Sequence, residues 1–171
     1  DIAGYQPGVI ENQGQRILVR SGPKLIEPSD GDCDMLRAII DGTLGSEQAQ
    51  YFHLWLKRSY ETLRDGQRAP GQVLAMCGAV KTNKSLILKL ITTILGGRAA
   101  SPYGYLTGAT DFNADLIRAE HWILDDEIPA SRMADRLRLG AMLKQVTARG
   151  GFHLHAKGRD ALDVDPFVRL S

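Results

Sequence analysis

The stretch Val73-Leu74-Ala75-Met76-Cys77-Gly78-Ala79-Val80-Lys81-Thr82-Asn83-Lys84-Ser85-Leu86-Ile87-Leu88 decides the fold. An apolar run, a glycine, a short loop, Lys-Ser and a second apolar pattern together predict a strand, a phosphate-binding loop and a helix. The usual pattern has glycine at position 83, where this chain has asparagine. Asparagine tolerates left-handed backbone angles better than most other non-glycine residues, so the loop can still close. We interpret the stretch as a Walker A loop with one substitution.

This loop is predicted to bind the phosphates of a nucleotide. N–H groups at the start of the helix would hold the anion, Lys84 would reach the β and γ phosphates, and the Ser85 hydroxyl would ligate Mg²⁺. The alternative is an ordinary strand-turn-helix with a surface lysine. The predicted nucleotide-binding residues are Gly78, Ala79, Val80, Lys81, Thr82, Asn83, Lys84 and Ser85.

A second motif follows in the order Glu120-His121-Trp122-Ile123-Leu124-Asp125-Asp126-Glu127. An apolar run is typical of a parallel strand buried on both faces, and acids after it would lie in the crevice where α/β sheets bind ligands. We assign Asp125 to the metal and Asp126 to water activation, and we include Glu127 and Lys84 among the catalytic residues. A register shifted by one residue would place an acid inside the strand. The alternative is a solvated acidic loop.

Length and composition place the chain among ordinary globular proteins. Its 171 residues allow one domain with a real core, or a domain with a small appendage. The formal net charge is +1, so any contact with nucleic acid must be local. Cys33 and Cys77 lack a CxxC spacing, which favours two reduced thiols in a cytosolic protein, and Cys77 falls in the predicted buried strand. No run approaches the ~18 apolar residues of a membrane span. The first residue is Asp rather than Met, so we expect a piece of a longer protein.

The sequence divides into three parts. Residues 1–31 carry many glycines and prolines and predict loops with one or two short strands, a linker or the end of a preceding domain. Residues 32–70 predict two helices, the first ending at Gly42 or Gly45 and the second capped by Ser46 over residues 47–65. The aromatic residues of the second helix favour a core role over base stacking. Residues 71–171 form the predicted ATPase core.

The rest of the core alternates helices and strands. The Walker A helix is expected over residues 83–95, a loop over 99–108, a short helix over 112–118 and a locally basic helix over 131–148. Residues 150–166 alternate around Lys157-Gly158-Arg159, which predicts a β-hairpin with a basic tip. By composition alone such a tip is more typical of a solvated turn. His153 and His155 share a strand face but have no third ligand nearby, which disfavours a metal site. A final strand is expected to begin at Phe167.

The order of these motifs resembles that of superfamily 3 helicases, especially the primase-helicase proteins of phages, mobile elements and large DNA viruses. The likeness covers residues 71–171. It depends on Gly78 to Lys84-Ser85, Thr107-Gly108-Ala109-Thr110-Asp111-Phe112-Asn113, Asp125-Asp126-Glu127, and Lys144 through Lys157 to Pro166.

This resemblance implies an α/β fold, a P-loop NTPase of AAA+ type with a parallel sheet flanked by helices, an N-terminal mainly helical segment and a C-terminal β-hairpin. It implies ATP and Mg²⁺ as cofactors, single-stranded DNA as partner, a ring that is most often a hexamer, and a primase domain or partner. The hairpin residues His155, Lys157 and Arg159, with Lys144, would contact the strand in the ring channel. A bacterial host or a virus-infected cell would be the setting. A basic hairpin that follows phosphates without reading bases suits a translocating motor.

Two departures separate this chain from that family. Asn83 replaces the usual loop glycine, and the sensor residue and arginine finger expected further along have no place before Ser171. The sequence therefore predicts a helicase core cut short, with an ATP-dependent DNA helicase as the parent protein. The alternative is a catalytically weak nucleotide- or DNA-binding module that assists assembly. A small P-loop kinase would need a lid and an acceptor site, neither of which is recognisable.

Overall fold

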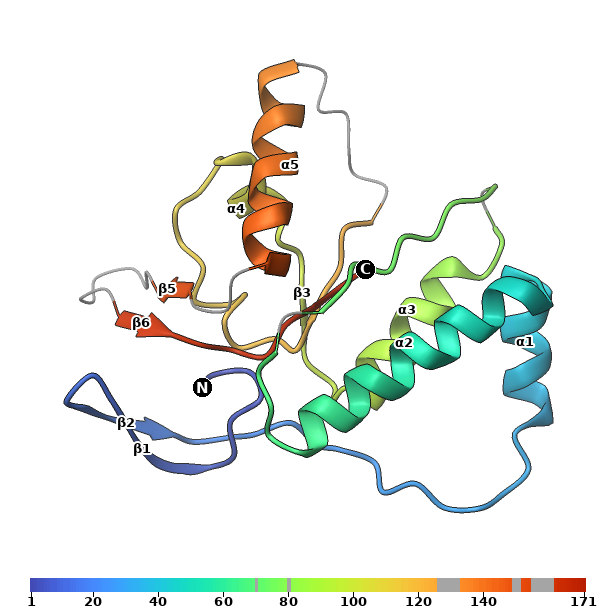
Figure 1. The fold of residues 1–171 in the computed structure, drawn as a ribbon, viewed down its shortest axis with the longest axis horizontal. Helices are drawn as coiled ribbons and strands as arrows, with labels where there is room; N and C mark the ends of the chain where they lie inside the picture. Colours follow the sequence, from blue (N-terminus) through green and yellow to red (C-terminus); the bar gives the residue numbers. More distant parts are fainter. Residues whose placement is uncertain (70, 80, 126–132, 149–151, 155–161) are drawn as a thin grey trace.

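A small parallel sheet lies at the centre of this computed structural model, which describes residues 1–69, 71–79, 81–125, 133–148, 152–154 and 162–171 (Figure 1). The strand order is β3 (Ala99–Ala100), β4 (His121–Trp122) and β7 (Arg169–Leu170), and both pairs are parallel. The backbone hydrogen bonds continue past β4, because Leu124 N–H donates to the Ser171 carbonyl at 2.8 Å. The predicted mixed α/β architecture with a parallel sheet is confirmed at this level.

The register of the sheet separates a polar face from an apolar face. His121 pairs with Arg169 and Trp122 pairs with Leu170, so each pair shares one face, because side chains alternate along strands. His121 and Arg169 meet helices α3 and α2, respectively, through hydrogen bonds. Trp122 and Leu170 belong to an apolar cluster with residues of α4 and α5. The sheet is therefore covered by helices on both faces.

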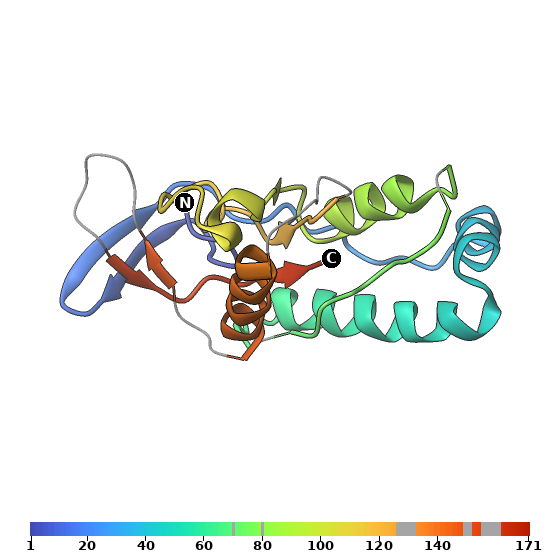
Figure 2. The same ribbon diagram turned by 90° about the horizontal axis from the view of Figure 1, so that it is seen from above.

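Helices α2 (Ser46–Arg64) and α3 (Lys84–Ile94) contact the polar face, and α1 (Asp34–Leu44) packs against α2. Figure 2 shows α2 and α3 side by side, and buried residues of both join one core cluster that includes Phe52, Leu63, Ile87 and Ile91. The first helix continues through Gly42 and ends at Gly45, the second of the two predicted positions.

Two expectations for α2 were wrong. Ser46 is its first helical residue and the cap position belongs to Gly45, which has no side chain to close the first turn. The apolar face is narrower than the sequence pattern indicated, because Leu54 is 65% exposed whereas Phe52 is buried. Only the side of α2 that meets α1 and α3 is core.

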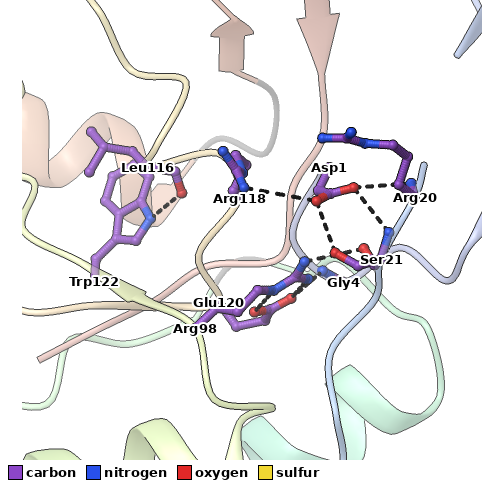
Figure 3. Close-up of polar contacts among 9 residues, drawn as sticks. All are labelled: Asp1, Gly4, Arg20, Ser21, Arg98, Leu116, Arg118, Glu120 and Trp122. Carbon is purple, nitrogen blue, oxygen red and sulfur yellow. Dashed lines mark hydrogen bonds and ion pairs between the residues drawn. The ribbon is translucent and has the colours of Figure 1, made fainter. Parts of the chain in front are cut away.

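The N-terminal residues are tied to the sheet by a polar cluster. Strands β1 (Gly8–Asn12) and β2 (Gln15–Val19) form an antiparallel hairpin, within the region where one or two short strands were expected. Figure 3 shows Arg98 paired with the fully buried Glu120, which also accepts a hydrogen bond from Gly4 N–H at 3.0 Å. Asp1 accepts hydrogen bonds from Ser21 N–H and Oγ. Residues near the start of the chain are thus bound to elements far along it.

The opposite face of the sheet carries α4 (Tyr103–Thr107) and α5 (Met133–Ala148). Helix α4 lies where a loop was expected, and residues 114–118 form turns rather than the predicted helix over 112–118. The turns stay short because a buried apolar cluster holds Leu116 against Trp122, whose indole N–H donates to the Leu116 carbonyl at 2.8 Å. The predicted hairpin is confirmed by β5 (Phe152–Leu154) pairing antiparallel with β6 (Leu162–Val164).

Some properties expected from composition are also observed. Both cysteines are free thiols. Within the described residues, no helix is long and apolar enough to cross a membrane.

Candidate functional site

The loop before α3 bends through left-handed backbone angles at its last residue. Asn83 adopts left-handed angles (φ 59°, ψ 10°), and its carbonyl accepts the first helical hydrogen bonds, from Leu86 and Ile87 N–H. The expectation that asparagine could take the place of glycine here is confirmed. Lys81 also has a positive φ of 63°, so the chain bends twice within this loop. Val80 lies outside the described residues.

The Lys84 side chain folds back over this loop. Its Nζ donates to the carbonyl oxygens of Gly78 at 3.0 Å and Ala79 at 2.6 Å, and to Thr82 Oγ1 at 3.1 Å. Thr82 Oγ1 in turn donates to the Ala79 carbonyl at 2.8 Å. All three ammonium N–H groups therefore have acceptors, yet every acceptor is neutral. A bound phosphate would exchange neutral oxygens for charged ones, and hydrogen bonds to charged groups are the stronger kind.

The predicted Walker B position lies beside this loop. Asp125 is exposed and lies three residues beyond the carboxyl end of β4. Asp125 and Lys84 together line two hollows, one of about 390 Å³ that also includes Ser85 and one of about 250 Å³ that also includes Ser171. The structure thus brings three of the predicted site residues, Lys84, Ser85 and Asp125, around one space. Asp126 and Glu127 lie outside the described residues.

The donor atoms here suit a hard divalent cation. Ser85 offers a hydroxyl and Asp125 a carboxylate, and Mg²⁺ is commonly held by one or two such oxygens with water and substrate phosphates supplying the rest. Within the described ranges, no three His, Cys, Asp or Glu side chains gather closely enough to form an all-protein metal centre. Ser85 and Asp125 thus offer two oxygen donors of the kind that such a cation takes.

The segment before the loop departs from the sequence expectation. Residues 73–77 run beside β7, where Leu74 N–H donates to the Leu170 carbonyl at 3.0 Å, but they are not a regular strand. Val73 and Cys77 are exposed, so the prediction of a buried strand was wrong. The exposure of these residues follows from the position of the segment in the sheet. Among the described residues, β7 is the one sheet strand that pairs with the segment, so its other edge is open.

A buried polar chain behind the loop had no signal in the sequence. His121 is fully buried on β4, and its ring nitrogens meet Thr92 Oγ1 of α3 at 2.8 Å and Ser171 Oγ at 2.7 Å. Desolvation lowers the pKa of His121 to about 4, so the ring is neutral near pH 7. These hydrogen bonds link α3 to β4 and to Ser171, the residue that follows β7. Ser171 also lines a hollow with Asp125.

The predicted DNA-binding residues lie elsewhere. Lys144 is an exposed residue of α5, the helix that packs against α4 on the apolar face of the sheet. His155, Lys157 and Arg159 lie outside the described residues, between β5 and β6. The structure therefore locates the two arms of the hairpin and leaves the role of its tip a prediction.

Comparisons with known proteins identify a shared fold. No protein-family model matches the chain, and no curated protein matches it. Similar solved structures include the apo structure of the NrS-1 C terminal region (305-718), with a TM-score of 0.66 and 13% identity, and the A form apo structure of the same region, with a TM-score of 0.71 and 16% identity. Each match covers 96% of this chain and 40% or 39% of the solved chain. The chain thus spans about two fifths of the structures that it matches.

Proposed function

We propose that this chain is the nucleotide-binding part of an ATP-dependent DNA helicase core of superfamily 3 type, from a replication protein. The observation that carries the proposal is the shared hollow of Lys84, Ser85 and Asp125, at the carboxyl end of a parallel sheet. The similarity in fold to the NrS-1 C terminal region is consistent with it.

Each residue has a distinct task in this proposal. The Lys84 ammonium leaves its neutral loop acceptors and neutralises charge on the β and γ phosphates, while backbone N–H groups at the start of α3 hold them in place. The Ser85 hydroxyl and the Asp125 carboxylate would hold Mg²⁺, which would supply further charge stabilisation. Asp126 orients and deprotonates the attacking water, and Glu127 completes the acidic group.

The basic hairpin supplies the link to DNA. In the parent ring, proposed as a hexamer that acts with a primase domain or partner, Lys157 and Arg159 follow the phosphates of a single strand while ATP is hydrolysed. His155 and Lys144 are included in this surface. Because the chain covers about two fifths of the solved structures that it matches, unwinding belongs to the longer protein.

A second candidate, a binding module without turnover, is favoured by two specific observations. The Lys84 ammonium is satisfied within its own loop, and Asn83 stands where the motif has glycine. Both features reduce the gain from binding a nucleotide. In that case the site would hold ATP and contribute to assembly without hydrolysing it.

The decisive experiment measures ATP hydrolysis with and without single-stranded DNA. The parent protein should show DNA-stimulated turnover, Lys84→Ala should abolish it there, and Lys89→Ala, which removes an exposed lysine from the same helix, should retain it. Asp125→Asn should lose turnover while still binding ATP. Binding that depends on Lys84 without any turnover would favour the module, and activity that survives Lys84→Ala would overturn both candidates.

A further inference from the structure

A buried arginine lies on the polar face of the sheet, away from the Walker loop. Arg169 of β7 is 3% exposed and faces α2. Its Nε donates to Ser59 Oγ at 3.1 Å, and its Nη1 donates to the carbonyl oxygens of Ala69 at 3.1 Å and Val168 at 2.9 Å. The guanidinium also lies 4.3 Å from the centre of the Phe167 ring. These contacts hold the group firmly in one orientation.

The charge of this group is not neutralised within the described part of the chain. Burial is the main cause, and the nearby Arg58 guanidinium the second, of a pKa of Arg169 lowered to about 10, so Arg169 remains charged near neutral pH. All hydrogen-bond partners of Arg169 are neutral, and no described carboxylate forms an ion pair with Arg169 or Arg58. The two N–H groups of Nη2 have no acceptor among the described residues. Burying such a charge without an anion is costly.

The two arginines line a hollow of about 470 Å³ between α2 and the residues Ala69, Gly71 and Gln72. Tyr51 and Trp55, one helical turn apart on α2, form part of the same wall. The Trp55 indole N–H donates to the Gln72 carbonyl at 2.8 Å, which fixes the ring. None of the residues that line this hollow lines the two hollows at Lys84. The space is therefore separate from the Walker site.

Gly71 shows that the backbone here is built around the guanidinium. A Cβ at this position would lie 2.7 Å from the Cδ, Nε and Nη1 atoms of Arg169, closer than such atoms approach in real structures. Only glycine lets the backbone at position 71 pass this close to a buried side chain. The arginine is thus enclosed by the chain on one side and open to the hollow on the other.

We propose that this hollow binds one nucleotide unit, with Arg169 and Arg58 holding its phosphate and Trp55 and Tyr51 contacting its base. Arg169 can donate to a phosphate from the two Nη2 N–H groups that its protein partners leave open, and aromatic rings stack on any base. The volume falls within the range of small-molecule pockets, larger than a single acidic side chain needs. The unit is either a free nucleotide or part of a single strand. The earlier expectation that the aromatics of α2 serve the core holds for Phe52, whereas Tyr51 is 65% exposed and is available to a ligand.

The test is a pair of calorimetric titrations, one with a nucleoside monophosphate and one with a short oligothymidine, on wild type and on variants. Lys84→Ala should bind like wild type, because the monophosphate lacks the β and γ phosphates that Lys84 would contact. Arg58→Gln should weaken binding about tenfold, the usual loss for one charge-assisted hydrogen bond. The matched control is Arg64→Gln, which removes the same charge from a part of α2 outside the hollow. It should leave the affinity for both probes unchanged.

A second set of variants separates binding from folding. Arg169→Lys keeps the buried charge but replaces the planar guanidinium with an ammonium group, so it should weaken binding. Trp55→Phe should reduce affinity for both probes. Binding of the monophosphate alone would identify a free nucleotide as ligand, and binding of the oligomer alone would identify a strand. The proposal is overturned if neither probe binds, or if affinity is the same in wild type, Arg58→Gln and Trp55→Phe.

Discussion

Arg98, which directly precedes β3, and Lys84, the first residue of α3, are basic side chains that meet different kinds of partner. Arg98 meets the buried carboxylate of Glu120, with Nε donating to Oε2 at 2.8 Å, in the cluster that ties down the N-terminal residues (Figure 3). Lys84 meets only neutral oxygens of its own loop. A charge balanced inside the protein stabilises the fold. A charge met only by neutral groups remains able to attract an anion.

The largest effect is expected when Arg98 is deprived of its carboxylate. Glu120→Gln leaves a partly buried guanidinium without its counter-charge and should lower the free energy of unfolding by about 3 kcal/mol, because removing one partner of a buried pair is strongly destabilising. Urea denaturation measures this change. Asp65→Asn, which breaks the exposed pair with Arg64, is the control and should leave stability close to wild type. An equal effect of both substitutions would remove the distinction between the two regions.

A somewhat smaller effect is expected from acid, through a group that burial keeps neutral. The pKa of His121 is lowered from 6.5 to about 4, so the unfolded chain binds the proton more readily than the folded one. Stability should therefore fall as the pH drops below about 6.5 and level off below about 4, by at most about 3 kcal/mol in total.

This acid effect is measured by urea denaturation across that pH range. His121→Gln should flatten the profile, whereas His53→Gln, which changes an exposed histidine on α2, should leave it unchanged. A profile that keeps its slope in His121→Gln would show that other groups cause the loss.

The smallest effect concerns the loop that positions Lys84. Asn83 has left-handed backbone angles, which cost an ordinary residue about 1 kcal/mol. Asn83→Ala should lower stability by about that amount relative to Asn83→Gly, since glycine adopts these angles freely. Thermal denaturation of the two variants, compared side by side, tests the expectation. Identical stability would mean that the loop relaxes away from the left-handed angles.

The features predicted correctly from the sequence are those that depend on residues close together along the chain. The bend at Asn83, the helix that begins at Lys84 and the acid after Leu124 all follow from short patterns, and each lies where it was expected. The hairpin of β5 and β6 follows from alternation around a turn.

Features that depend on contacts between distant residues could not be predicted. Arg169 and Ser59 are separated by 110 positions, and no periodicity relates them. The exposure of Cys77 depends on which strands pair beside its segment. Similarly, the partners of His121 come from a helix and a strand that only the folded sheet brings together. The arginine hollow is likewise lined by residues that are far apart in the sequence, so no sequence pattern predicted it.

The most direct test of the central claim is a titration of wild type and Lys84→Ala with ATP and Mg²⁺, with the stability of both proteins measured under the same conditions. Because Lys84 contacts only neutral loop oxygens, we expect Lys84→Ala to fold with nearly unchanged stability and to lose about 100-fold in ATP affinity, which corresponds to about 2.7 kcal/mol. Equal ATP affinity in the two proteins would contradict the account, because the loop would then be a strand-turn-helix with a surface lysine.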